Sequence, residues 1–366
     1  MRIFSCQCGH TIFFENIICT ACGRALGYLP DRQTLGAIKP AEKEQWISSD
    51  SPRRYRKCGN YEKENICNWM VPSEDPNVFC RACRLNQVIP NLSQPNHRLY
   101  WAKLEAAKRR LLYTLFQLGL AVSSKEEDPE HGLAFAFLGD ASAESEFTQP
   151  IDSQETVYTG HTQGLITINL AEADDIARTR IREQLREGYR TLLGHFRHEV
   201  GHYYWDLLIK ETSHLPTFRQ HFGDETQDYQ QALSAFYENG PLANWESHYI
   251  SAYATAHPWE DWAESWAHYL HIVDTLDTAQ AYGLVIQGRS LASVKVPART
   301  TVTCDFSTLL DDWLRLSVAL NDLNRSMGLN DAYPFVLHDP VKQKLRFVHD
   351  VIAKRKDVSP PERGKR

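Results

Sequence analysis

The stretch that most constrains this chain is residues 194–210, with the sequence GHFRHEVGHYYWDLLIK. It contains His198, Glu199 and His202 in the pattern H-E-x-x-H. On a helix the two histidines lie one turn apart on the same face, so both imidazoles can reach one metal ion. Glu199 is out of register with the two histidines and can contact a metal-bound water without binding the metal.

The same pattern could belong to a surface helix with two solvated histidines. Neighbouring apolar residues argue against that alternative, because their helical spacing predicts a buried face. They are Leu193, Phe196, Val200, Tyr203 and Leu207. Asp206 continues the row of the two histidines, where it is either a carboxylate that supports a metal ligand or a solvated acid at the helix end.

Length and composition describe an ordinary globular protein. A chain of 366 residues is long enough for two or three domains, and its 42% hydrophobic and 23% charged residues are usual values. The N-terminus does not resemble a signal peptide, and no apolar run is long enough to cross a bilayer. We therefore expect a cytoplasmic protein that has no membrane partner.

The nine cysteines are unevenly distributed, and only Cys304 lies far from the N-terminus. In a cytosolic protein such a concentration indicates zinc rather than disulfides. Two pairs, each followed by glycine, predict a zinc ribbon in residues 1–30 with one structural zinc: Cys6 with Cys8, and Cys19 with Cys22. The first pair is C-x-C instead of the usual C-x-x-C, so His10 is an alternative ligand at that position.

A second group of cysteines predicts another structural zinc in residues 53–95, because a short segment with little aliphatic core usually needs a metal. Its members are Cys58, Cys67, Cys80 and Cys83. Residues 31–52 between the two groups are polar and predict a linker. The basic run at 53–57 is interpreted as a solvated face, with a nucleic-acid or protein surface as the less favoured alternative.

The remainder, residues 98–353, is predicted to form one domain that opens with a helix, followed by strands near 133–138 and 164–170. Leu165–Leu170 is either an ordinary sheet strand or the strand that pairs with an extended substrate. Helices are expected near 309–323 and 341–352. The charged tail at 354–366 is predicted to be disordered.

A catalytic zinc usually has three protein ligands and an open water position. A third histidine six residues after His202 is ruled out, because that position is Leu208. The alternative is a glutamate from a second helix, which Pro258 would begin. There Glu260 would bind zinc, and Glu264, one turn later, would hydrogen-bond a ligating histidine from behind. Tryptophans around both acids predict burial, and buried carboxylates need partners.

H-E-x-x-H followed by E-x-x-A-E resembles the gluzincin arrangement, and Y-x6-E-x-x-A-E is most similar to the lethal-factor-like zinc peptidases. This resemblance implies that Glu260 is the third ligand and that Tyr253 stabilises the oxyanion. Most of the chain resembles the bacterial zinc-binding metallopeptidases with an N-terminal zinc ribbon. The stretches that carry this likeness are FFEN at 13–16, CGRALGY at 22–28, CRACRLN at 80–86, FRHEVGHYYWD at 196–206 and SAYATAHPWEDWAESWAHYLHIVDTL at 251–276.

The expected fold is α+β, with a mainly helical zincin-like metallopeptidase domain and a small sheet, preceded by small zinc-ribbon modules. The expected function is hydrolysis of peptide or protein substrates by a zinc-activated water, with Glu199 as general base. One catalytic and two structural Zn²⁺ ions are predicted. The alternative is a protein- or nucleic-acid-binding zinc-ribbon protein whose zincin domain is inactive or auxiliary. A zinc hydrolase acting on another amide remains a third reading.

Overall fold

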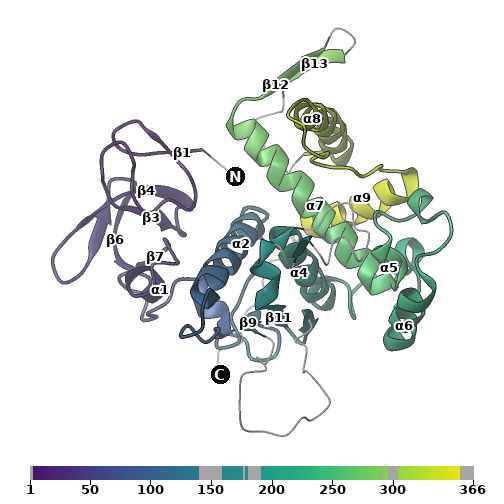
Figure 1. The fold of residues 1–366 in the computed structure, drawn as a ribbon, viewed down its shortest axis with the longest axis horizontal. Helices are drawn as coiled ribbons and strands as arrows, with labels where there is room; N and C mark the ends of the chain where they lie inside the picture. The colour runs from purple at the N-terminus through teal and green to yellow at the C-terminus, as the bar shows by residue number, and fades with distance from the viewer. Residues whose placement is uncertain are drawn as a thin grey trace, which may run out of the picture. The chain divides into compact units, whose positions relative to one another are not determined.

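The computed structural model describes residues 3–139, 159–175, 178–179, 191–288, 291–295 and 304–354. These ranges combine helices with small sheets and two N-terminal cysteine clusters, so the predicted α+β class is confirmed. The chain divides into two compact units, and Figure 1 labels many of their helices and strands. The first comprises Met1–Tyr113 with Val122–Phe196, and the second comprises Thr114–Ala121 with Arg197–Arg366.

A five-stranded antiparallel sheet follows a short hairpin at the start of the first unit. The hairpin joins β1 (Phe4–Ser5) to β2 (Thr11–Ile12). The sheet strands are adjacent in chain order: β3 Leu26–Leu29, β4 Thr34–Pro40, β5 Trp46–Ser48, β6 Ser51–Lys57 and β7 Met70–Pro72. Buried aromatic rings, among them Tyr28, Tyr55 and Trp69, give this small sheet its core.

The structure corrects the predicted linker, because residues 31–52 contain β4, β5 and the start of β6. Leu35, Ala37 and Ile38 of β4 are buried, whereas most of the polar residues that suggested a linker lie in the turns and at the strand ends. β4 buries four consecutive residues instead of alternate ones, and β5 has only three residues, so neither shows the alternation typical of a strand. The polar turns then dominate the composition.

The cysteine-rich segments predicted as two modules, 1–30 and 53–95, share this β structure. The side-chain amide of Asn68 donates to the Phe14 carbonyl at 2.6 Å, and the Tyr61 hydroxyl donates to the Leu26 carbonyl at 2.6 Å. Tyr28 of β3 also forms a parallel bridge with Trp69. The two cysteine-rich segments are therefore parts of one folded body, instead of independent modules on a linker.

The second sheet of the first unit has the order β10, β11, β9, β8. Its strands are β8 Asn86–Val88, β9 Ala134–Leu138, β10 Gly160–Thr162 and β11 Leu165–Asn169. Because β11 pairs with β9 on one side and β10 on the other, the structure corrects the suggestion that Leu165–Leu170 pairs with substrate. Alternating residues identify a strand but not its place in the sheet.

Helix α2 (His97–Gln117) packs on this second sheet, since the ammonium of Lys108 lies over the rings of Phe135 and Phe137 in β9. The described residues of the first unit also form three short helices. They are α1 Gly59–Glu62, η1 Cys83–Leu85 and η2 Leu170–Ala173. Strand β8 begins directly after η1, so the cysteine-rich part continues without a break into the second sheet.

The second unit is built around the long helix α7 (Pro258–Ala281), which packs against α5, α8 and α9 (Figure 1). Helix α4 (Leu192–Leu208) enters this unit at Arg197. The remaining elements are α5 Leu215–Phe222, α6 Tyr229–Asn239, η3 Trp245–Ser247, η4 Tyr253–Thr255, β12 Val285–Gly288, β13 Leu291–Lys295, α8 Phe306–Ser326 and α9 Asp339–Lys354. The helices predicted near 309–323 and 341–352 are α8 and α9.

Two other regions can be compared only in part. The tail predicted to be disordered begins at the last residue of α9, and residues 355–366 lie outside the described ranges. The charged stretch 171–190 before α4 is also predicted to be helical, and within it only 171–175 and 178–179 are described. None of the described helices is long and apolar enough to span a membrane.

Gly201 allows α4 and α7 to approach closely. A Cβ atom at this position would lie 3.0 Å from the Ala263 Cα and 3.3 Å from the Trp266 side chain. The indole of Trp262 also donates to the Gly201 carbonyl at 2.9 Å. The second variable position of H-E-x-x-H is therefore a packing position, and it brings the first turn of α7 next to the two histidines.

A buried ion pair joins α9 to the first turn of α7. The Lys344 ammonium contacts an Asp261 carboxylate oxygen at 2.6 Å and donates to the His248 carbonyl at 2.9 Å. We expect Lys344→Met to lower the free energy of unfolding by about 3–5 kcal/mol, because it leaves a buried carboxylate without its cation. Urea denaturation measures this loss.

The Lys344→Met effect should depend on pH. Burial outweighs the attraction of Lys344 and raises the pKa of Asp261 to about 7. A carboxyl whose pKa is higher in the folded state destabilises the fold as pH rises above its unfolded value of about 4. Removing Lys344 raises the pKa of Asp261 further, so the loss of unfolding free energy in Lys344→Met should be larger at pH 8 than at pH 5. Lys342→Met, which removes a surface pair with Asp339, is the control and should cost about 1 kcal/mol or less.

Candidate active site and metal centres

Three side chains of the second unit bring one ligand atom each to a common point. His198 and His202 extend from one face of α4, and their Nε2 atoms are 3.3 Å apart. Oε2 of Glu260, in the first turn of α7, lies 3.0 Å from the first Nε2 and 3.6 Å from the second. All three residues are largely buried, and Glu260 is only 1% exposed.

This triangle fits a tetrahedral metal site. Ligand atoms about 2.0–2.1 Å from a zinc ion are separated from one another by about 3.3 Å in a tetrahedron, close to the three distances observed. The hydrogen bond between His198 Nδ1 and Glu264, at 2.7 Å, favours a proton on Nδ1 and a lone pair on Nε2. Nε2 of His198 and Oε2 of Glu260 are then both acceptors, so either a proton or a metal cation must lie between them.

The charges of the site lead to the same conclusion. Burial by itself would lower the pKa of His198, but the hydrogen bonds and charges of Glu260 and Glu264 raise it well above its ordinary value. Burial opposes ionisation of Glu264, yet the contact with His198 lowers the pKa of Glu264 to about 2. Two carboxylates are thus held ionised around two imidazoles, which is an environment that attracts a divalent cation.

The other predicted residues of the active site lie on α4 and on η4, the short helix just before α7. Glu199 is buried on α4, with 4% of its surface exposed. Tyr253 lies in η4, where its ring centroid is 6.0 Å from that of His198. Among the described residues, the Tyr253 hydroxyl has no hydrogen-bond partner. Burial and the charge of Glu260 raise the pKa of Tyr253, so the phenol remains a donor at neutral pH. Asp206 is half-buried one turn beyond His202, and its supporting role remains a prediction.

Two residues near the site were missed by sequence reasoning. Tyr229, the first residue of α6, donates a hydrogen bond to Oε1 of Glu260 at 2.7 Å. His257 caps α7, since its Nδ1 accepts from the Trp259 amide at 3.1 Å. Asp228 before Tyr229 and Pro258 after His257 are helix-start signals, but neither indicates that the helix start lies at a metal site.

The first cysteine cluster brings together Cys6, Cys8, Cys19 and Cys22. The sulfurs of Cys6 and Cys22 are 3.6 Å apart, and those of Cys8 and Cys19 are 3.7 Å apart. A tetrahedron of thiolates about 2.3 Å from zinc has edges of about 3.8 Å, whereas a disulfide would require about 2.05 Å. The alternative ligand His10 is not part of the cluster, and its Nε2 contacts the Thr20 hydroxyl at 3.5 Å.

The second cysteine cluster brings together Cys58, Cys67, Cys80 and Cys83, all buried. The Cys67 and Cys80 sulfurs are 3.8 Å apart. Backbone amides donate to the sulfurs, for example Cys80 N to Cys58 Sγ at 3.3 Å and Trp69 N to Cys67 Sγ at 3.4 Å. Burial and the neighbouring thiols raise the pKa of Cys80 well above its ordinary value, so four thiolates require a cation among them.

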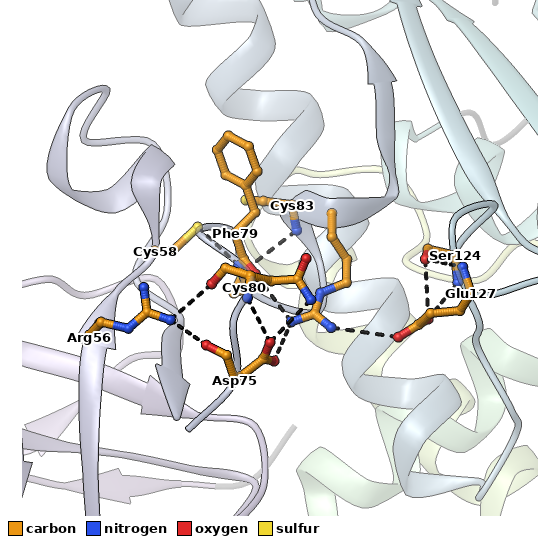
Figure 2. A network of polar contacts seen from close by, with 10 residues as sticks. Arg56, Cys58, Asp75, Phe79, Cys80, Cys83, Ser124 and Glu127 are labelled. Carbon is orange, nitrogen blue, oxygen red and sulfur yellow. Dashed lines mark hydrogen bonds and ion pairs between the residues drawn. The ribbon is translucent and has the colours of Figure 1, made fainter. Parts of the chain in front are cut away.

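A polar network includes Cys58, Cys80 and Cys83 of the second cluster (Figure 2). Asp75 accepts a hydrogen bond from Arg84 at 2.6 Å, and Arg84 also pairs with Glu127 at 3.6 Å. Glu127 in turn accepts from the Ser124 amide at 2.8 Å. Arg56 donates to backbone carbonyls of the loop before Cys80, including that of Asn77 at 3.1 Å. The network therefore connects the segment around Cys80 and Cys83 to Ser124 and Glu127, which follow α2 in the same unit.

Buried charges of α2 also lie beside the second cluster. Glu105 accepts from the Cys83 thiol at 3.8 Å and pairs with Lys108 at 2.7 Å, and both charged side chains are inaccessible to solvent. Arg109 donates to the Ile66 carbonyl at 2.8 Å. Burial opposes its charge, but Cys67 and Glu105 raise the pKa of Arg109. A four-thiolate zinc site carries net negative charge, and Glu105, Lys108 and Arg109 together place one net positive charge beside it.

The fold and these clusters define a zinc-binding protein with a ribbon at its N-terminus and a metallopeptidase-like site. The model of the family described as "Putative zinc-binding metallo-peptidase" matches residues 97–351, and a zinc-ribbon domain model matches residues 3–94. The chain therefore belongs to this zinc-binding metallopeptidase family. Uncharacterized proteins of Mycobacterium tuberculosis and Mycobacterium bovis are each 42% identical over 354 residues, covering 96% of this chain and 95% of theirs. No solved structure matches this chain.

Proposed function

We propose that the second unit is a zinc-dependent peptidase of the gluzincin type. The observation that carries this proposal is the convergence of His198, His202 and Glu260, with Glu264 behind His198 and Glu199 on the same helix. A bound zinc would polarise a water and the substrate carbonyl. The residues around it match the acids and donors that peptide hydrolysis needs.

In the proposed mechanism Glu199 accepts a proton from the attacking water and delivers it to the leaving amine. Tyr253 donates a hydrogen bond to the oxyanion, because its ring lies near that of His198 and its hydroxyl stays protonated. Glu264 holds the His198 ring through Nδ1, which fixes its orientation and leaves Nε2 for the metal. We take peptides or proteins as substrates and, since thiol clusters persist in reducing compartments, the cytoplasm as the location.

Metal content tests the ligand assignment. We expect about three zinc ions per chain in the native protein, two in the cysteine clusters and one at the histidines. Glu260→Ala should retain two, because the catalytic site loses its only anionic ligand. Glu246→Ala, which removes an exposed glutamate of η3, is the control and should retain three. Elemental analysis of the purified chains measures the counts.

Two outcomes would contradict parts of this proposal. If Glu260→Ala keeps three zinc ions, Glu260 is not the third ligand and Glu264 becomes the candidate. If the native protein holds three zinc ions but cleaves no peptide, the inactive or auxiliary zincin domain and the non-peptide amide hydrolase become the better explanations.

A further inference from the structure

We propose that Tyr229 is a positioning residue of the zinc site, which confines Glu260 to a one-oxygen contact with the metal. This inference rests on the proposed function. Oε2 of Glu260 faces the two histidine nitrogens, at 3.0 Å from His198 and 3.6 Å from His202. Oε1 accepts the Tyr229 hydroxyl at 2.7 Å. One carboxylate therefore has a separate partner for each oxygen.

The division of the two oxygens matters because a carboxylate can bind a metal through one oxygen or both. A second oxygen on the metal would occupy space that a catalytic site keeps for water. The phenol of Tyr229 stabilises Oε1 away from the histidines by a charge-assisted hydrogen bond.

Backbone contacts fix Tyr229 to the same helix end that carries Glu260. The Nε2 of His257, the residue that caps α7, contacts the Gln227 carbonyl at 3.2 Å. The Asp228 carboxylate caps α6 by accepting from the Gln231 amide at 2.9 Å, so α6 begins at Tyr229. The loop before them turns at Gly223, whose φ of 103° favours glycine.

Aromatic packing also holds the Tyr229 ring. Its centroid is 5.9 Å from that of Trp259 and 5.2 Å from that of His257, both in edge-to-face geometry. Trp259 also packs edge-to-face on the ligand His202, at 5.6 Å. Phenylalanine would keep these ring contacts and lose only the hydroxyl, so Tyr229→Phe isolates the hydrogen bond.

The two tyrosines near the site have different tasks in this arrangement. The Tyr229 hydroxyl is engaged by a ligand, whereas the Tyr253 hydroxyl has no partner among the described residues. Tyr253 is therefore the tyrosine available to substrate, and Tyr229 acts through Glu260. Since none of the α6 residues is fully buried, removing one hydroxyl there should leave the fold intact.

The test compares Tyr229→Phe with Tyr237→Phe, which removes the hydroxyl of an exposed tyrosine on the same helix. Competition with a chromophoric chelator gives the zinc affinity of the third site, and the visible bands of Co²⁺ in that site report its coordination. We expect Tyr229→Phe to bind zinc about 10–100-fold more weakly, as for other residues that hold a ligand. Its cobalt bands should shift, and Tyr237→Phe should match the native protein in both measurements.

Equal zinc affinity and identical cobalt bands in native protein and Tyr229→Phe would overturn this inference, provided that the native protein binds the third metal. A native protein that binds only two zinc ions would instead defeat the proposed function. The thermal unfolding temperature and the two structural zinc ions of each variant, measured on the same samples, separate a loss of the site from a loss of the fold.

Discussion

Glu199→Gln is expected to lower peptide hydrolysis by about 10²–10⁴-fold while the chain keeps all of its zinc, because the variant loses the general base and no metal ligand. Glutamine preserves the size of the buried side chain, which is 4% exposed in the native protein. It cannot accept a proton from the attacking water. Initial rates with an unstructured protein such as casein, together with zinc content, measure the two effects separately.

The matched control is Glu246→Gln, the same chemical change at an exposed position of η3, for which we expect native rates. A Glu199→Gln variant that cleaves at the native rate would exclude Glu199 as the base. Loss of the third zinc in Glu199→Gln would also count against the assigned role, because the carboxylate would then be needed for binding the metal.

The centre of the candidate site was predictable because its geometry is local. His198 and His202 are one helical turn apart, and so are Glu260 and Glu264, so the spacing alone places each pair on one face. The buried aromatic residues around Glu260 indicated that the second helix packs inward. The spacing does not show that α4 and α7 lie against each other. Gly201, within the motif, permits their close approach.

Tyr229 could not be predicted in the same way. Its contact with Glu260 spans 31 positions and depends on the path of the loop that ends at Asp228. That path is set by Gly223, which has a positive φ, and by a backbone contact of His257. The glycine predicts a turn, but neither feature indicates where the Tyr229 side chain will lie. A tyrosine in a segment with many aromatic and acidic residues carries no signal that distinguishes it from its neighbours.

For the N-terminal part, the sequence predicted the two groups of cysteines but not the sheet that joins them. Cysteine spacing identified two groups that the structure brings together, and C-x-C spacing did not remove Cys8 from the first group. The linker at 31–52 was wrong because sheet pairing is non-local: β4 and β5 are recognisable only beside β3 and β6. The composition of residues 31–52 is dominated by the polar turns between these strands, and for that reason it suggested a linker.

Cys80→Ser is expected to unfold the cysteine-rich part of the first unit and to disrupt α2 with it. Binding of structural zinc contributes apparent free energies of about 10–16 kcal/mol in small zinc domains, as much as the whole stability of a typical domain. Without the metal, Glu105, Lys108 and Arg109 would remain as buried charges around protonated thiols. Zinc content and circular dichroism during thermal unfolding measure the loss.

Cys304→Ser is the control, because it removes the one cysteine outside both clusters and should retain three zinc ions and the native unfolding temperature. The effect of Cys80→Ser should extend past residue 94, where the ribbon match ends. Strand β8 pairs with β9, and Arg84 pairs with Glu127. We therefore expect the segment around Cys80 and Cys83 to unfold together with the second sheet, as one cooperative unit. If hydrogen exchange in Cys80→Ser shows native protection of α2 and β9, the ribbon folds separately and this coupling does not exist.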